Sequence, residues 1–217
     1  MSRRRSLVLG LGLAVAAPLA FLGSPATAAP SPAEAYDFNG DGLADLAVGA
    51  PSLTDGEGPE GGVAVLTASK AGLGDEAQVL TPDSPGVAGE SGGEDQFGAT
   101  LASGDFDADG YADLAVGLPV AYRAYEGAGS VTVLYGSAKG LTGVRSSELL
   151  QPGGPTSDVA FGSSLAAGDF DGDGRADLAV SVEDAVAVFP GSTTGLAQSR
   201  STRLLSKDDN DDDRWDD

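Results

Sequence analysis

The sequence contains no cysteine and no histidine. Without cysteine the chain forms no disulfide, so its fold depends on some other stabilising interaction. Without histidine, the Ser-His-Asp and Cys-His arrangements of nucleophilic enzymes are excluded, as is a zinc site with histidine ligands. These absences remove several common enzyme classes.

Positive charge is also scarce, with 12 Lys and Arg residues against 33 Asp and Glu residues and a formal net charge of −21. So acidic a surface argues against binding nucleic acid or inserting stably into an anionic membrane. It favours partners that are cations, or simply keeps the protein soluble. A sustained apolar stripe of helical period is missing outside the N-terminal leader, which argues against a helical fold.

The leader, residues 1–28, has the layout of a signal peptide. Arg3–Arg5 precede an apolar run from Leu7 to Leu22 and a small-residue site, Ala26-Thr27-Ala28. We expect cleavage after Ala28 and export by the Sec or the twin-arginine route, which makes the mature protein secreted. A membrane anchor is a weaker interpretation, because the run is short and interrupted by Pro18. Removal of the three arginines takes the net charge to −24.

One pattern occurs three times, as DFNGDGLADLAVG at 37–49, DFDADGYADLAVG at 105–117 and DFDGDGRADLAVS at 169–181. Each copy is followed by an alternating apolar segment of strand period, at 62–73, 130–141 and 185–196, and then by a short polar-apolar stretch. Four short strands per repeat of this length are typical of a propeller blade. The expected fold is therefore all-β, a partial β-propeller over residues 29–206 with repeats at about 36–90, 97–153 and 161–206.

Residues 207–217 follow the third repeat and are strongly acidic. They are predicted to form a solvated acidic tail or the start of a truncated fourth repeat, since Asp213-Arg214-Trp215-Asp216 mirrors Asp95-Gln96-Phe97-Gly98.

The Asp-rich loops have the pattern of metal sites. Oxygen-bearing side chains stand at positions 1, 3, 5 and 9, a glycine at position 6 permits a sharp bend, and the carbonyl at position 7 can add a further oxygen. Four carboxylates about 5 Å apart repel by about 5 kcal/mol even in water, and a divalent cation reverses that repulsion. The predicted metal ligands are Asp37, Asn39, Asp41, Leu43 and Asp45, then Asp105, Asp107, Asp109, Tyr111 and Asp113, then Asp169, Asp171, Asp173, Arg175 and Asp177.

An all-oxygen, flexible ligand set favours Ca²⁺, so we expect about three structural calcium ions. Plain hairpin turns are the simpler alternative, but three copies in one register disfavour it. An EF-hand is excluded, because its Glu at position 12 is replaced by Val48, Val116 or Val180.

Together with Phe97-Gly98, Phe161-Gly162 and Gly49-Ala50-Pro51, the loops make the chain resemble FG-GAP repeats, found in integrin alpha subunits and in exported bacterial proteins. The resemblance implies four-stranded blades, structural Ca²⁺ between the first and second strand, and ligands bound by loops on the propeller faces. The first repeat departs from the family pattern because it lacks Phe-Gly, and the third has Ser181-Val182-Glu183 in place of Gly-Ala-Pro.

The function that follows is a secreted calcium-binding module for adhesion to an extracellular protein or glycan, with no catalytic residues. Tyr122, Arg123 and Tyr125 are the predicted contact residues. Two alternatives stay open, a secreted hydrolase or lyase that uses the propeller as a scaffold, and an inactive truncated fragment of a seven-blade protein. Self-association that completes the propeller is a further alternative, because three blades do not close a ring.

Overall fold

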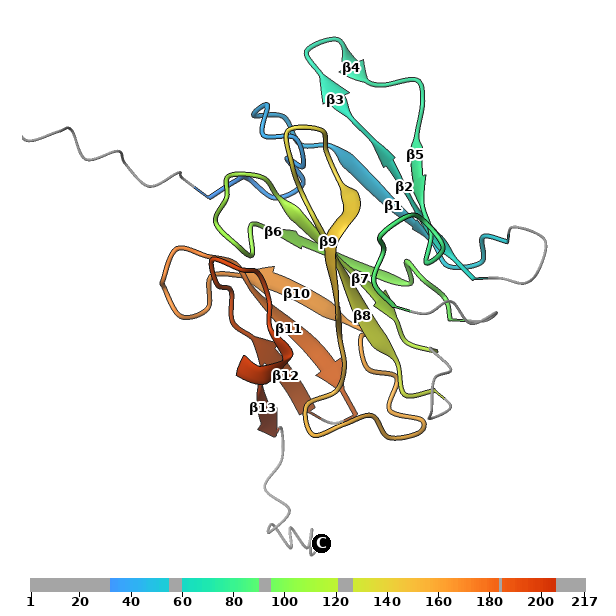
Figure 1. Ribbon diagram of the computed structural model, residues 1–217, viewed down its shortest axis with the longest axis vertical. Coiled ribbons are helices and arrows are strands. Elements are labelled where there is room, and N and C mark those ends of the chain that lie inside the picture. The colour runs from blue at the N-terminus through green and yellow to red at the C-terminus, as the bar shows by residue number, and fades with distance from the viewer. Residues whose placement is uncertain (1–31, 55–59, 90–94, 121–126, 184, 206–217) are drawn as a thin grey trace, which may run out of the picture.

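The computed structural model describes residues 32–54, 60–89, 95–120, 127–183 and 185–205 (Figure 1). The expected signal peptide, the acidic tail and the expected contact residues Tyr122, Arg123 and Tyr125 lie outside these ranges. The described chain is all-β with one short 3₁₀ helix, η1 (Gln198–Arg200). Within these ranges no helix has the length and apolar character to cross a membrane.

Three antiparallel sheets account for the repeats, each in the order in which its strands follow along the chain. The first sheet contains β1 (Leu46–Ala50), β2 (Gly62–Leu66) and β5 (Gln78–Leu80), with a small hairpin of β3 (Ala68–Ser69) and β4 (Gly72–Leu73) beyond it. The second contains β6 (Thr100–Gly104), β7 (Asp113–Leu118), β8 (Ser130–Tyr135) and β9 (Thr142–Leu149). The third contains β10 (Leu165–Gly168), β11 (Asp177–Val182), β12 (Ala185–Phe189) and β13 (Thr202–Leu205).

This arrangement confirms the partial propeller of three repeats, with one difference. The second and third sheets have four strands, whereas the first has three. Residues 32–36, the described residues before the first loop, form no strand with β1. Ala33 N–H donates to Asp105 Oδ2 at 3.0 Å and Tyr36 N–H to Ser103 Oγ at 2.8 Å, so this segment lies against the second sheet. It is also the place where the sequence has no Phe-Gly.

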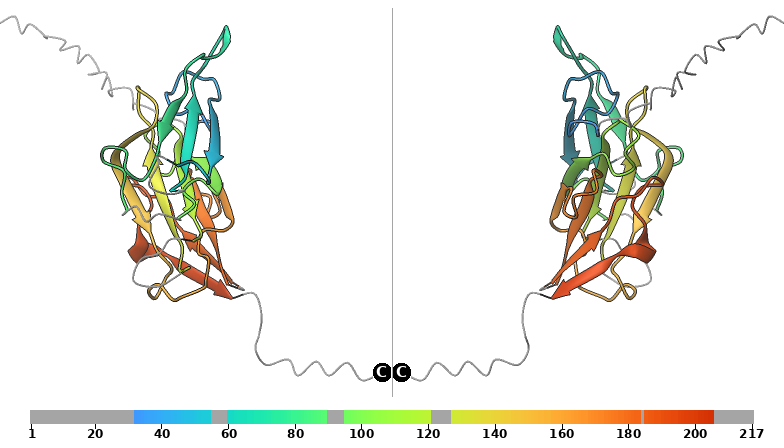
Figure 2. Two further views of the ribbon diagram at one scale, coloured as in Figure 1. Left: turned by 90° about the vertical axis from the view of Figure 1, so that its right-hand side faces the viewer. Right: turned by 90° about the vertical axis from the view of Figure 1, so that its left-hand side faces the viewer.

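The apolar core lies between successive sheets, which follow one another along the length of the molecule in both side views (Figure 2). Position 2 of each loop shows how the sheets pack. Phe38 is fully buried in a cluster with residues of the second sheet such as Leu114 and Leu134, and Phe106 is fully buried in the cluster of the third sheet. Phe170 is 54% exposed, because no further sheet covers it in the described chain.

Backbone hydrogen bonds tie neighbouring sheets together at the loop end. The carbonyl of Asp105 accepts from Ala176 N–H at 3.0 Å, and that of Phe106 accepts from Ser192 N–H at 3.1 Å. The first loop makes the same pair of bonds to the second sheet, from Asp37 O to Ala112 N–H and from Phe38 O to Ser137 N–H. The first and second loops are therefore also the joints between their own blades and the next.

At the end of the sheets opposite the acidic loops, the backbones of neighbouring blades approach one another closely. This close approach explains why two positions of the repeated pattern are glycine. A Cβ on Gly49 would overlap the carbonyl oxygen of Gly98, and one on Gly117 would overlap that of Gly162. The Phe-Gly turn of each following blade thus packs directly on the glycine that ends LAVG. Ser181 occupies the corresponding place in the third blade and bonds within that blade, to Ser163 Oγ and Ser164 N–H at 2.9 Å each.

Candidate metal centres

The three acidic loops share one hydrogen-bonding pattern, best described for residues 105–113. At position 1, Asp105 Oδ1 accepts from Asp109 N–H at 3.2 Å and Oδ2 accepts from Gly110 N–H at 3.1 Å. The chain therefore curls around this carboxylate, and Gly110 permits the curl because its φ is +91°. Asp37 and Asp169 accept the equivalent bonds in the other loops.

Positions 3 and 5 stabilise the turn further. Asp107 Oδ1 also accepts from Asp109 N–H at 3.2 Å, and Asp109 Oδ1 accepts from Tyr111 N–H at 3.1 Å. The second oxygen of each of these two carboxylates accepts no hydrogen bond from the described backbone of the loop. The same bonds are made by Asn39 and Asp41 in the first loop and by Asp171 and Asp173 in the third.

The aspartate at position 9 also has a structural role, which the sequence pattern does not reveal. The buried Asp113 carboxylate accepts from Phe106 N–H at 2.9 Å and, with its other oxygen, from Gly136 N–H at 2.9 Å just beyond β8. It therefore joins the loop to the third strand of the blade. Asp45 bonds in the same way to Phe38 and Ala68, and Asp177 to Phe170 and Gly191.

Burial makes the ionised form of these carboxylates costly. Burial raises the pKa of Asp113 to about 8, with smaller upward contributions from the charges of Asp107 and Asp105. Burial also raises the pKa of Asp45, and burial together with the Asp107 carboxylate raises that of Asp109. A dication among these groups would favour their ionised form instead.

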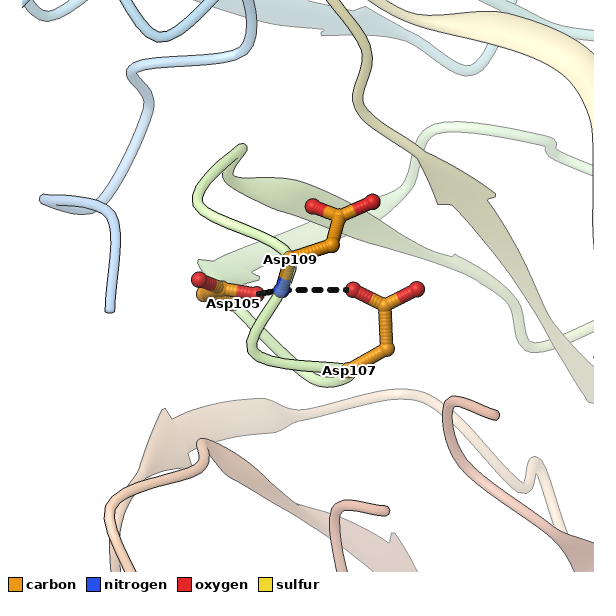
Figure 3. A group of neighbouring side chains, drawn as sticks. All are labelled: Asp105, Asp107 and Asp109. Carbon is orange, nitrogen blue, oxygen red and sulfur yellow. Dashed lines mark hydrogen bonds between the residues drawn. The ribbon is translucent and has the colours of Figure 1, made fainter. Parts of the chain in front are cut away.

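Carboxylate oxygens converge in two of the loops. One oxygen from each of Asp105, Asp107 and Asp109 lies within 4.8 Å of the others, as does one from each of Asp169, Asp171 and Asp177. Figure 3 shows the backbone nitrogen of Asp109 between the carboxylates of Asp105 and Asp107. In the first loop position 3 is Asn39, whose amide donates to Asp41 Oδ2 at 3.4 Å.

The loop residues fit a hard dication, because their convergent donors are all oxygen. Each position-7 residue (Leu43, Tyr111 or Arg175) donates its N–H to the position-5 carboxylate. Calcium occupancy and the contribution of each of the fifteen residues stay predictions.

Two arginines that the sequence pattern did not assign as cations lie against the loops. Arg145, from β9, places Nη2 at 2.6 Å from Asp107 Oδ2 and Nη1 at 3.7 Å from Asp109 Oδ2. Arg175, predicted only as a carbonyl donor, pairs its guanidinium with Asp173. No sequence signal links Arg145 to a loop 38 residues away, whereas Arg175 belongs to the loop itself.

Comparison with protein families finds the FG-GAP repeat at residues 33–66, 97–134 and 161–193. The chain is 37% identical to integrin alpha-PS5 of Drosophila melanogaster over 161 residues, which cover 71% of this chain and 15% of that protein. It is 35% identical to integrin alpha-7 of Mus musculus over 160 residues, covering 70% of this chain and 12% of the relative.

A relative of another kind is phosphatidylinositol-glycan-specific phospholipase D of Rattus norvegicus, 37% identical over 147 residues, which cover 67% of this chain and 17% of the relative. The chain thus spans 12–17% of the length of these three relatives. The repeated loops, the sheet order and these matches agree: the chain is an FG-GAP repeat protein similar to integrin alpha subunits.

Proposed function

We propose that this chain is a secreted, calcium-stabilised FG-GAP module that binds an extracellular protein or glycan. The observation that carries the calcium part is the common geometry of the loops, each of which folds its backbone around a carboxylate at position 1. Secretion rests on the signal-peptide pattern of residues 1–28. The adhesive role rests on the resemblance to integrin alpha subunits.

Calcium has a physical task in this fold. The first and second loops join their blades to the next, and there is no cysteine to form a disulfide in their place. At ten times its dissociation constant an ion adds about 1.4 kcal/mol to stability, so three ions add roughly 4 kcal/mol. That is a large fraction of the free energy of unfolding of a typical domain.

Partner contacts are proposed for the connections that follow β1 and β7. Both strands start at the acidic loops, so these connections begin at the opposite end of the sheets. Residues 51–61 and 119–129 form these connections in the first and second blades. The expected contact residues Tyr122, Arg123 and Tyr125 belong to the second of them, and tyrosine and arginine are enriched where binding energy is concentrated.

Self-association of blades is restricted by Ser181. A further blade that approached the third one as Gly162 approaches Gly117 would meet the Ser181 side chain. Any second copy that covers this face must therefore pack in a different way from the blades within the chain.

A catalytic role has less support. Burial raises the pKa of Asp45, Asp109 and Asp113, and these carboxylates all belong to the acidic loops rather than to a separate cleft. The relative whose name states an enzyme activity is matched over 17% of its length.

Calorimetric titration of the secreted chain with Ca²⁺ tests the calcium part. We expect up to three ions per chain, and Asp41→Ala, Asp109→Ala and Asp173→Ala each to remove one. Stoichiometry that stays the same in all three variants would disprove the loops as the sites. The adhesive part is tested by binding to arrayed extracellular proteins and glycans with Ca²⁺ or chelator, where binding that is indifferent to Ca²⁺ contradicts the proposal.

A further inference from the structure

The second acidic loop differs from the other two in carrying a cation from elsewhere in the chain. Arg145 lies in β9 and contacts both Asp107, at 2.6 Å, and Asp109, at 3.7 Å. The same guanidinium lies over the ring of Tyr135, with its central carbon 5.1 Å from the ring centroid. Two carboxylates and an aromatic face therefore hold one positive group at the mouth of this loop.

The backbone of β9 is adapted to this contact. Arg145 has a φ of +66°, a conformation that residues other than glycine rarely adopt, and the pairing of β8 with β9 shifts register between Val133 and Tyr135. A residue persists in such a conformation where its surroundings fix it. The irregularity in β9 coincides with the residue whose side chain reaches the loop.

Burial separates this ion pair from an ordinary surface contact. The Asp107 side chain is 2% exposed, while that of Arg145 is 50% exposed. A buried carboxylate is costly to ionise alone, so its partner has a greater effect than a partner at the surface has. In the third loop, by contrast, both Arg175 and Asp173 are about a quarter to a third exposed.

The first loop differs from the second most strongly in the cationic partners of its carboxylates. In the part of the chain that the structure describes, no Lys or Arg forms an ion pair with its carboxylates. The three loops thus have similar backbones and different internal counter-ions.

We propose that Arg145 is an internal counter-ion that competes with a divalent cation for Asp107 and Asp109. This inference rests on the proposed calcium function. Without metal, Arg145 offsets part of the negative charge of the second loop, and Ca²⁺ fills the loop only after the guanidinium moves from the carboxylates towards solvent. The second loop is therefore the weakest of the three sites and fills last, so that full loading of the module requires a higher calcium concentration than loading of the first loop.

The experiment compares the wild-type chain with Arg145→Gln and with Arg175→Gln as the matched control, by calorimetric titration with Ca²⁺. Glutamine keeps the length and polarity of much of the side chain and removes the charge. We expect Arg145→Gln to tighten the weakest site by about tenfold, as a hydrogen bond to a buried charge would suggest. Arg175→Gln should change that site by less than about twofold.

Terbium luminescence excited through tyrosine identifies the loop concerned. Tyr135 lies under Arg145 at the second loop, whereas Tyr36 adjoins the first loop and the Tyr111 ring lies against Gly40 of that first loop. In a Tyr36→Phe, Tyr111→Phe background, the luminescence titration of Arg145→Gln should shift to lower Tb³⁺ concentration. Arg145→Lys, which keeps the charge but loses the planar two-nitrogen contact, should shift it less and serves if the glutamine variant does not fold.

The outcomes separate the two proposals. Unchanged or weaker affinity in Arg145→Gln, while the other sites of the wild-type chain bind Ca²⁺, overturns the competition and leaves the calcium function standing. No binding by any variant overturns both. A site that binds only in Arg145→Gln supports the competition in its strongest form.

Discussion

Asp113 and Gly136, 23 residues apart, are joined by a hydrogen bond of 2.9 Å from the buried glycine N–H to the carboxylate. The other carboxylate oxygen holds Phe106 N–H at 2.9 Å. The aspartate at position 9 therefore links the loop to the residue that follows β8 through hydrogen bonds, whether or not it also binds a metal ion. The structural role and the metal-binding role can be tested separately.

Asp113→Asn is expected to destabilise the chain by about 3 kcal/mol in chelator, because its amide offers one acceptor to two buried N–H donors. The measurement is the free energy of unfolding in denaturant. Asp109→Asn is the control: Asp109 is 35% exposed in its side chain, and Asn keeps an acceptor for Tyr111 N–H. It should cost less than about 1 kcal/mol in chelator while reducing the stabilisation by Ca²⁺. Equal losses in chelator would contradict the division of roles.

Phe106→Ala is expected to lower the free energy of unfolding by about 3–5 kcal/mol, because a fully buried ring between the second and third sheets is replaced by a cavity. Phe170→Ala makes the same change at the same loop position, where the ring is 54% exposed, and should cost less than about 1 kcal/mol. Similar costs for the two variants would show that loop phenylalanines do not join the blades.

Gly117→Ser is expected to destabilise by about 2–3 kcal/mol, because the added Cβ would overlap Gly162 O and Thr100 Oγ1. The reverse exchange in the third blade, Ser181→Gly, loses two hydrogen bonds and should cost about 1 kcal/mol. Thermal unfolding of both variants measures the difference, and a harmless Gly117→Ser would mean that the blades approach less closely than described.

Ala108→Gly is expected to stabilise the chain by about 0.5–1 kcal/mol. Ala108 has a φ of +56°, where the other two loops have Gly40 and Gly172. Gly172→Ala is the reciprocal test, since a Cβ there meets nothing within 4 Å and only the backbone strain at a φ of +78° remains. It should destabilise by about 1 kcal/mol, and a gain in stability would refute the strain argument.

The repeated loops and the strands after them could be predicted because their signals are local. Alternation places Val131 and Val133 in β8, and the spacing of Asp and Gly fixes the curl from Asp105 to Gly110. Both depend on neighbours a few residues away in the chain.

Features set by contacts between blades could not be predicted in this way. Phe106 and Phe170 occupy identical local patterns, yet one is buried and the other exposed, because only one has a sheet packed over it. The pairing of Arg145 with Asp107 likewise depends on an irregular β9 that brings the two together. The bonds of Ala33 to Asp105 and of Tyr36 to Ser103 also join parts of the chain that are about 70 residues apart.

The central claim is that the acidic loops hold calcium. The most direct measurement is a crystal structure of the secreted chain grown with Ca²⁺, with anomalous data that identify the ion. The account predicts an anomalous peak within each loop, bound to carboxylate and carbonyl oxygens at about 2.3–2.6 Å. Loops without such peaks, with carboxylates bonded only to backbone N–H groups and Arg145 still on Asp107, would contradict it.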